Sequence, residues 1–502
     1  MSDSVPAPLT AAEVRAVVLG SVLALFLAAL DQSIVATALP AIAAELGRVE
    51  LMSWVVTAYL LASTCATPVL GKASDVLGRR RVLAGCLIVF LGGSVLCSLA
   101  TSMPMLIAAR ALQGLGGGGL ITLAQATVAD VVPPRERGRY VAYFASVWAC
   151  AGLLGPTLGG LLTQYLGWPW IFWINLPLGL AALVITDRVL RRLPVRGGTR
   201  GRIDLPGIVL LSTATTALLL ALSFGGHRWP WASAPILGLL ALAVVPALLF
   251  AHRQRHTAEP LLPPAFFRDP VVAPTGAALF LVFGGFLAVA VLVPAWLQIG
   301  LGRSAAAAGL LMMPMSLAAP LTATLTGHYL RATGRYRRPP QLGLPLAAVA
   351  LLALAGVALA GPQAPAPGWL AALLALIGLG IGPIFSASLT AAQNAVEPRD
   401  VGAVTGALTF ARALGGAVWV AAGSALVLGL ALAWLPQLGT LGGLEDLVRR
   451  PLAAAERAAL GEAFAAVFVA AAGLLLLGLL LWSRVAERPL RGADAAPVSA
   501  ET

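Results

Sequence analysis

The sequence predicts an all-α polytopic membrane protein whose fourteen transmembrane helices form two six-helix bundles and an inserted pair. First, 59% of its 502 residues are hydrophobic, 11% are charged and the mean hydropathy is +0.90. A chain of this composition has too few polar residues to cover the surface of a soluble globular protein. Second, its apolar runs of roughly 18 to 28 residues are long enough to cross about 30 Å of hydrocarbon. Third, most of the 33 lysines and arginines fall in alternate segments between these runs.

The apolar runs place the helices along the chain. They cover, in order, residues 16–39, 51–71, 82–100, 104–129, 140–165, 168–187, 204–224, 233–252, 271–297, 305–326, 342–361, 367–393, 401–434 and 462–482. With the N-terminus in the cytoplasm, the basic segments 71–82, 131–140 and 188–203 all lie on the cytoplasmic side, as the positive-inside rule requires. An even number of helices then places both termini in the cytoplasm.

An internal repeat organises these helices. Residues 113–138, QGLGGGGLITLAQATVADVVPPRERG, align with residues 377–402, IGLGIGPIFSASLTAAQNAVEPRDVG, at an offset of 264. An offset of 256 likewise aligns Gly71 with Gly327. Two near-equal offsets at matching helices favour a duplication over a chance alignment of small residues. Parallel six-helix repeats around a midplane site are a transporter architecture.

The duplication also predicts domain boundaries. The first six helices pair with the last six, and the seventh and eighth helices have no counterpart. We therefore expect an N-terminal six-helix bundle over residues 1–187, a linker with two inserted helices over 188–270, a C-terminal six-helix bundle over 271–485 and a cytoplasmic tail over 486–502.

Five motifs carry a resemblance to a known family. They are LDQSIVATALP (30–40), GKASDVLGRRRV (71–82), RALQGLGGGG (110–119), GLLGPTLGG (152–160) and FARALGGAVWVA (410–421). Through them the chain resembles the major facilitator superfamily and, within it, the fourteen-helix drug:proton antiporters, a branch that contains multidrug exporters. The resemblance implies a transporter of the major facilitator fold.

The loop between the second and third predicted helices resembles the superfamily's signature. Its matching residues are Gly71, Asp75, Gly78, Arg79 and Arg80. Two glycines permit close backbone approach, and a carboxylate favours the partial positive charge of a helix N-terminus. By resemblance, the partner of Asp75 is the cytoplasmic end of the thirteenth helix near Val401, and the arginines can pair with Asp130 and Glu136. We predict a conformational latch; a topology anchor is the alternative, which explains the arginines but not Asp75.

A charge pair is predicted inside the first half. Asp31 is the only acid well inside any predicted span, roughly 12 Å from the outer end of its helix, and Arg110 lies at a similar depth of roughly 9 Å. Ionisable residues inside a membrane are costly and are functional candidates by default. An opposite charge favours ionised Asp31 and exclusion of water favours its protonated form, so a conformational change can drive proton exchange. We predict that this pair couples protons to transport; a permanent structural ion pair is the alternative.

Further candidates lie on four helices. Gln32, Gln113 and Arg412 are predicted to line the substrate cavity, although Arg412, roughly 17 Å from the cytoplasmic end of its helix, can instead contact a helix backbone or the latch. The fifth helix carries a motif that resembles the antiporter motif, with Gly155, Pro156, Gly159 and Gly160. Its proline and glycines predict a bend and close packing. In the family this motif is thought to limit leak; a generic packing face is the alternative.

These features predict a proton-driven exporter of amphipathic drugs, antibiotics or secondary metabolites. Its alanine, leucine, glycine and arginine bias indicates a GC-rich bacterial genome, hence a bacterial plasma membrane. The expected partners are small amphipathic substrates, protons and membrane lipid, with no nucleic acid, and the expected state is a monomer. No cofactor or metal is expected, because the four cysteines lack the paired spacing of a metal site.

The sequence lacks the motifs that other classes of membrane protein would carry. An ATP-driven exporter needs a GxxxxGK[ST] phosphate loop, which does not occur. The four histidines have no obvious catalytic partners, so no enzyme is predicted. The alternative function is a proton-coupled importer of peptides or other small solutes, which is expected to carry an acid-rich motif on its first helix, where only Asp31 stands.

Overall fold

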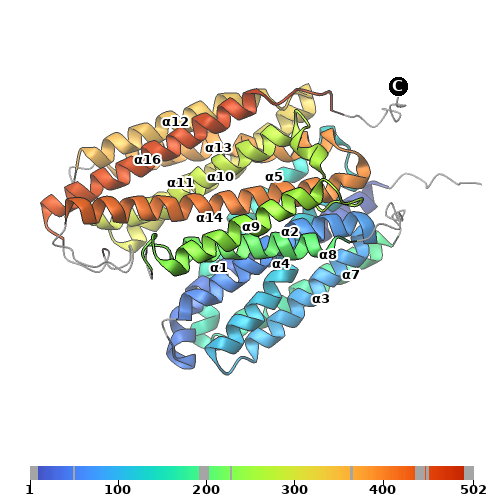
Figure 1. The fold of residues 1–502 in the computed structure, drawn as a ribbon, viewed down its shortest axis with the longest axis horizontal. Helices are drawn as coiled ribbons and strands as arrows, with labels where there is room; N and C mark the ends of the chain where they lie inside the picture. Colours follow the sequence, from blue (N-terminus) through green and yellow to red (C-terminus); the bar gives the residue numbers. More distant parts are fainter. Residues whose placement is uncertain are drawn as a thin grey trace, which may run out of the picture.

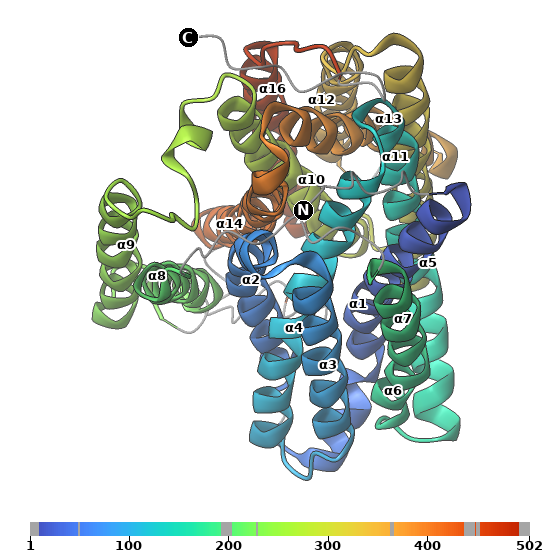
Figure 2. The ribbon, with the colours of Figure 1, turned by 90° about the vertical axis from the view of Figure 1, so that its right-hand side faces the viewer.

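The structure, a computed structural model, is built from α-helices. It describes residues 10–48, 51–191, 203–226, 229–361, 366–435, 447 and 452–490. The helices labelled in Figures 1 and 2 are α1 (Ala11–Leu46), α2 (Met52–Leu77), α3 (Arg79–Ser98), α4 (Met103–Val131), α5 (Pro134–Tyr165), α6 (Trp170–Trp173), α7 (Asn175–Leu190), α8 (Leu205–Phe224), α9 (Ala234–Gln254), α10 (Val272–Ile299), α11 (Ala305–Thr333), α12 (Arg338–Leu359), α13 (Pro367–Ala395), α14 (Val401–Trp434) and α16 (Ala454–Ser483).

The described residues contain 14 helical spans long and apolar enough to cross a membrane, which confirms the predicted number. Helix ends differ from the predictions, because backbone hydrogen bonds continue a helix beyond its apolar part. Helix α1 starts five residues earlier than its predicted span, at a capping box formed by Thr10 and Glu13, and continues to Leu46. The sixth span is interrupted at Ile174, between α6 and α7.

Helices α1–α7 and α10–α16 form two bundles with separate hydrophobic cores. Two clusters between Val17 and Leu190 fill the first bundle, and a larger one between Val271 and Leu490 fills the second. In Figure 1 the bundles lie together at the end where α1 begins and α16 ends, which we call the terminal end, and they diverge toward the opposite end. A smaller cluster contributed by α4, α10, α13 and α14 joins them.

The duplication is visible in how helices pack. A Cβ on Gly114 of α4 would meet the backbone oxygen of Tyr59 on α2, and one on Gly378 of α13 would meet the backbone oxygen of Met315 on α11. The two glycines differ by the predicted offset of 264 and their partners by 256. Gly118 repeats the relation one turn later: it contacts the backbone of Ser63, as Gly382 contacts that of Ala319. Helices α4 and α13 therefore occupy equivalent places in the two bundles.

The inserted pair lies at the edge of the molecule. Figure 2 shows α8 beside α2 and α14, with α9 on the far side of α8. Asp204, at the start of α8, accepts hydrogen bonds from Arg253 and Gln254 at the end of α9, at 2.7 and 2.9 Å. Burial raises the pKa of Asp204, but the hydrogen bonds from Arg253, the Gly207 amide and Gln254 together hold that pKa below its ordinary value.

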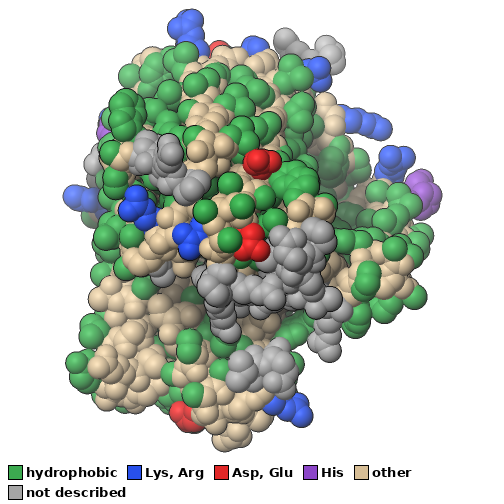
Figure 3. Space-filling view, turned by 90° about the vertical axis from the view of Figure 1, so that its left-hand side faces the viewer, with side chains coloured by type: hydrophobic (Ala, Val, Ile, Leu, Met, Phe, Trp, Pro, Cys, Tyr) green, Lys and Arg blue, Asp and Glu red, His purple; other side chains and the backbone are tan. Residues whose placement is uncertain are grey.

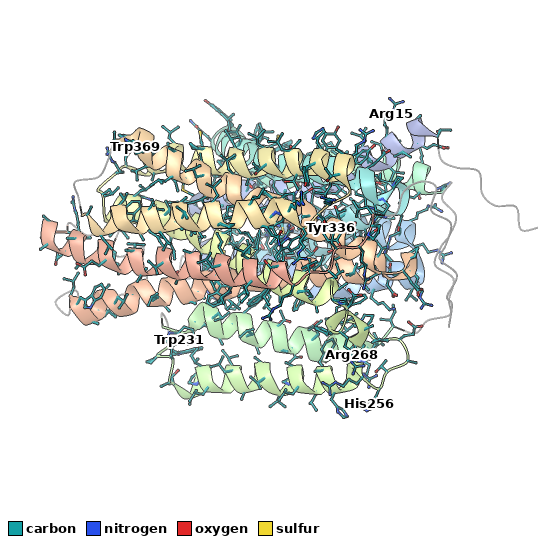
Figure 4. The ribbon with its side chains drawn as sticks, turned by 90° about the horizontal axis from the view of Figure 1, so that it is seen from above. Arg15, Trp231, His256, Arg268, Tyr336 and Trp369 are labelled. Carbon is teal, nitrogen blue, oxygen red and sulfur yellow. The ribbon has the colours of Figure 1, made fainter. Side chains whose placement is uncertain are left out.

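The surface is that of a membrane protein. Many large hydrophobic side chains of the described helices are exposed. Figure 3 shows the end opposite the terminal end, where hydrophobic groups lie beside scattered basic and acidic side chains. Figure 4 places Trp231 and Trp369 toward the end opposite Arg15, as expected for aromatic residues at a membrane boundary. The chain is thus a multi-pass membrane protein.

Candidate functional site

A charge pair lies in the interior of the first bundle. Arg110 Nη1 of α4 lies 2.6 Å from Asp31 Oδ2 of α1. The side chains are 1% and 0% exposed, so neither charge reaches solvent. Removing one partner of such a pair costs about 3–5 kcal/mol, because it leaves the other charge buried and uncompensated.

Polar side chains from two further helices complete the site. Gln113 Nε2 and Asn175 Nδ2 donate to Asp31 Oδ1 at 2.9 and 3.0 Å, and Gln113 Oε1 accepts from Arg110 Nη1 at 2.6 Å. Ser94 Oγ of α3 accepts from both amides, at 2.7 and 3.2 Å. We call these five residues the buried polar network. In it the Asp31 carboxylate accepts three N–H hydrogen bonds.

Aromatic rings cover the arginine. The guanidinium carbon of Arg110 lies 4.3 Å from the ring centre of Tyr59 and 5.8 Å from that of Phe172. Its Nε also donates to the Val55 carbonyl at 3.3 Å. One polar atom here, Asn175 Oδ1, is buried without a hydrogen-bond partner in the part of the chain that the structure describes. Such unpaired groups are costly and mark places where a network can rearrange.

Sequence reasoning found part of this network. The structure brings together Asp31, Arg110 and Gln113, but Gln113 is fully buried inside the network and not on an open cavity wall. The residues that were missed are Tyr59, Ser94, Phe172 and Asn175. Only Asn175 carried a signal, as an amide within an apolar run.

Of the other predicted cavity residues, Gln32 borders the network beside Tyr59 and Arg412 lies apart from it. Gln32 is half-buried on α1 and makes no hydrogen bond to Asp31 or Arg110. Arg412 is half-buried on α14 of the second bundle, with its guanidinium carbon 5.2 Å from the ring centre of Phe283. A cavity of about 1100 Å³ lies between α1 and α5 near the terminal end, but none of the predicted cavity residues lines it.

The predicted latch joins the two bundles at the terminal end. Asp75 Oδ1 accepts from the Gly402 amide at 2.9 Å, and its Oδ2 accepts from the Ala403 amide at 2.7 Å. These amides belong to the first turn of α14, whose N-terminal partial charge favours an anion. A Cβ on Gly71 would collide with the Gly402 carbonyl, so glycine is what lets α2 approach α14 this closely.

The latch arginines anchor α3 differently from the prediction. Arg79 pairs with Asp75 at 2.6 Å and with Asp130 of α4 at 2.8 Å. The pairing with Asp130 was expected. Arg80, however, pairs with Asp187 of α7 at 2.7 Å. In the described residues Glu136 forms no ion pair with either arginine, so that expected pairing is wrong; α7 and not α5 borders Arg80. Gly78 adopts a φ of +91° at the break between α2 and α3, where a side chain would be strained.

The motif on α5 packs against α1 next to the network. A Cβ on Gly155 would meet Ser33, and one on Gly159 would meet Thr37 and the Ile34 carbonyl. Pro156 and Gly160 are exposed, so they do not take part in this contact. Helix α5 also packs against α11 of the second bundle. It therefore links the helix that carries Asp31 to the opposite half.

Comparisons with known proteins agree with this architecture. The family model described as Major Facilitator Superfamily matches residues 21–206 and 207–420. An uncharacterized MFS-type transporter of Mycobacterium tuberculosis is 37% identical over 93% of this chain and 69% of its own length. The multidrug transporter protein MdtP of Bacillus subtilis is 34% identical over 79% of this chain and 72% of its own length.

Solved structures share the fold. The human organic anion transporter MFSD10 superposes with a TM-score of 0.64 at 18% identity, covering 93% of this chain and 99% of its own. The proton:xylose symporter XylE superposes with a TM-score of 0.63 at 15% identity, covering 95% and 97%. At these identities the likeness concerns the fold alone.

Proposed function

Because the chain belongs to the major facilitator superfamily, whose members are transporters and not enzymes, we propose that it exports amphipathic organic compounds in exchange for protons. The compounds are drugs, antibiotics or secondary metabolites, and the membrane is a bacterial plasma membrane. The terminal end faces the cytoplasm in this proposal. Relatives named as a multidrug transporter and as the efflux pump dotC, each 34% identical, support export.

The observation that carries proton coupling is the enclosure of Asp31 in the buried polar network. Its charge is balanced by Arg110 and by two amide donors, with no water-exposed surface. A protonated carboxyl has one O–H to donate and accepts more weakly, so binding a proton must rearrange these bonds. Asn175 Oδ1, which has no partner among the described residues, becomes an acceptor for that O–H when the amide rotates. Protonation and network geometry are thereby coupled.

Contacts between helices connect the buried polar network to the second bundle. A change around Asp31 moves α1, which contacts α5 through Gly155 and Gly159, and α5 contacts the second bundle at α11. Opening of the cytoplasmic end must break the two bonds between Asp75 and the start of α14. Alternation between these states moves substrate outward while a proton moves inward.

An assay in energised inverted vesicles tests the proposal. We expect uphill uptake of amphipathic dyes that is abolished by nigericin plus valinomycin in potassium buffer. The Asp31→Asn variant should bind substrate but lose uphill uptake, because its amide no longer carries the charge. Glu45→Gln, an exposed acid on the same helix, is the matched control and should transport normally.

Two outcomes would contradict the proposal. Full uphill transport by well-folded Asp31→Asn would place the coupling group elsewhere. Proton-driven peptide accumulation in right-side-out vesicles, without dye export, would identify an importer.

A further inference from the structure

Arg412 is a charge without a counter-charge. It lies in the middle of α14, and within the described residues its guanidinium forms no ion pair and donates no hydrogen bond. Its guanidinium carbon lies 5.2 Å from the centre of the Phe283 ring. A guanidinium carries five N–H donors and stays charged, so a purely structural arginine at this depth would need acceptors. The side chain is only half-buried, which leaves these donors open to a ligand.

The Phe283 ring beside this arginine belongs to a cluster of three aromatic rings. Phe283 and Phe286 of α10 and Phe385 of α13 form a cluster with ring centres 5.8 to 6.1 Å apart. All three are half-buried, so the cluster keeps an open apolar face. Arg412, Phe283 and Phe385 each lie about 15–17 Å from the terminal end of their own helix, hence at one depth.

The cluster lies where α10 meets α13 and α14. Helix α10 carries the rings on the side that packs against α13 and α14. Phe385 packs against a hydrophobic cluster that includes Ala126 and Ala129 of α4. Helix α14 is itself flanked by α2 and α4. Phe385 therefore borders the cluster that joins the two bundles, and Arg412 lies on the helix of the second bundle that contacts α2 and α4. This architecture places its substrate between the repeats.

The same stripe of α14 presents a second donor. Trp419, two turns beyond Arg412, packs against α10 at Gly284, and its indole Nε1 is buried without an acceptor. Indole N–H and guanidinium groups donate and cannot accept. The one acid deep in the first bundle, Asp31, is fully buried and already paired with Arg110, so it is closed to a substrate cation. In the described residues, the polar groups of α14 here that lack acceptors are thus donors, and the accessible one, the Arg412 guanidinium, favours a negatively charged acceptor.

We propose that Arg412 and the three phenylalanines form a subsite for aromatic organic acids, with a carboxylate or sulfonate on the guanidinium and the ring system on Phe283, Phe286 and Phe385. The assignment rests on the proposed export function and names its substrate class. Arginine suits this role because its planar fork binds carboxylates in two-point geometry while its face stacks on aromatic rings. A cationic substrate of the same shape is repelled.

Three probes of one shape test the subsite. They are biphenyl-4-carboxylate, biphenyl-4-carboxamide and biphenyl-4-ylmethylammonium, titrated calorimetrically into the purified full-length protein in detergent. We expect the carboxylate to bind at least ~10-fold more tightly than the carboxamide, which corresponds to about 1.4 kcal/mol. The ammonium compound should bind most weakly. Equal binding of all three probes to the wild type would overturn the assignment without any variant.

Single substitutions test which side chains cause the preference for the carboxylate probe. Arg412→Gln should bring the carboxylate-to-carboxamide ratio to about one while carboxamide binding is kept, and that retained binding reports a folded site. Arg412→Lys should keep part of the ratio, because it retains the charge without the fork. Phe385→Leu should weaken both probes alike. Arg331→Gln, an exposed arginine at the end of α11, is the matched control and should keep the wild-type ratio.

The binding measurement is independent of proton coupling. An undiminished carboxylate preference in Arg412→Gln overturns the subsite, whatever the vesicle assay shows. Conversely, a preference that depends on Arg412, together with transport that ignores the proton gradient, defeats the coupling mechanism and leaves the subsite standing.

Discussion

The two bundles share a packing frame but differ in what they bury. Helix α4 contacts α2 through Gly114 and Gly118, and α13 contacts α11 in the same way through Gly378 and Gly382. Inside this shared frame, the first bundle holds the buried polar network and the second holds apolar side chains. The corresponding pairs at the repeat offsets are Asp31 and Leu287, Arg110 and Leu374, Gln113 and Ile377, and Tyr59 and Met315.

The contacts between helices therefore do not require the charges of Asp31 and Arg110. Leu374 and Ile377 are fully buried in the core of the second bundle, where leucine and isoleucine fill the space without polar partners. A buried ion pair offers little net stability over such packing. Its retention in the first bundle alone fits a functional division, with proton exchange proposed for one half and substrate charge recognition, through Arg412, for the other.

The largest effect is expected from breaking the pair on one side only. Arg110→Leu should destabilise the protein by about 3–5 kcal/mol, because the Asp31 charge is left buried without its partner. The triple variant Asp31→Leu, Arg110→Leu, Gln113→Ile, which copies the second bundle, should recover most of that loss yet abolish uphill transport. Thermal unfolding in detergent and the vesicle assay measure the two effects. A triple variant less stable than Arg110→Leu would show that the network holds the first bundle together.

A smaller effect is expected at the latch, which the second bundle lacks because Arg331 stands at the position equivalent to Asp75. Asp75→Asn replaces charge-assisted hydrogen bonds to α14 with one weak acceptor, at a cost of about 1.5–3 kcal/mol to the latched state. Export should fall about tenfold or more, at normal protein levels in the membrane. Arg331→Gln is the matched control and should export normally. Normal export by Asp75→Asn would reduce the segment to a topology anchor.

The smallest effect separates packing from coupling. Gly114→Ala and Gly378→Ala each force a methyl group against the backbone of a neighbouring helix, at a cost of about 1–3 kcal/mol. Only Gly114→Ala displaces Tyr59, which covers Arg110, so only that variant should alter the pH dependence of transport. Unfolding temperatures and transport rates between pH 6 and 8 test this. Equal pH profiles would mean that Tyr59 has no part in coupling.

Much of the architecture was predictable because its causes are local in sequence. A bilayer requires about twenty apolar residues per helix, so hydropathy alone predicts the number of spans. The duplication was predictable because close contact between helices allows only small residues. Glycines therefore recur at the same spacing in both halves. The partnership of Asp75 with the start of α14 was also expected, from the resemblance of its segment to a known signature.

Contacts between segments far apart in the sequence were harder to predict. Arg80 pairs with Asp187 and not with Glu136, because the bundle brings α7 and not α5 beside it. Ser94 and Asn175 are unremarkable in sequence, and they become partners of Asp31 only because α3 and α7 meet α1 and α4. No periodicity encodes such a meeting.

The sequence by itself determined the spans, the repeat and the presence of one acid and one base inside the first half. Tertiary structure alone decided how those charges are satisfied. Asp31 and Arg110 are enclosed by groups from four other segments, whereas Arg412 meets an aromatic ring and, within the described residues, no counter-charge. The physical reason is that a charge in low dielectric is governed by every group within a few ångströms. Those groups come from helices far apart in the chain, so their arrangement exists only in the folded molecule.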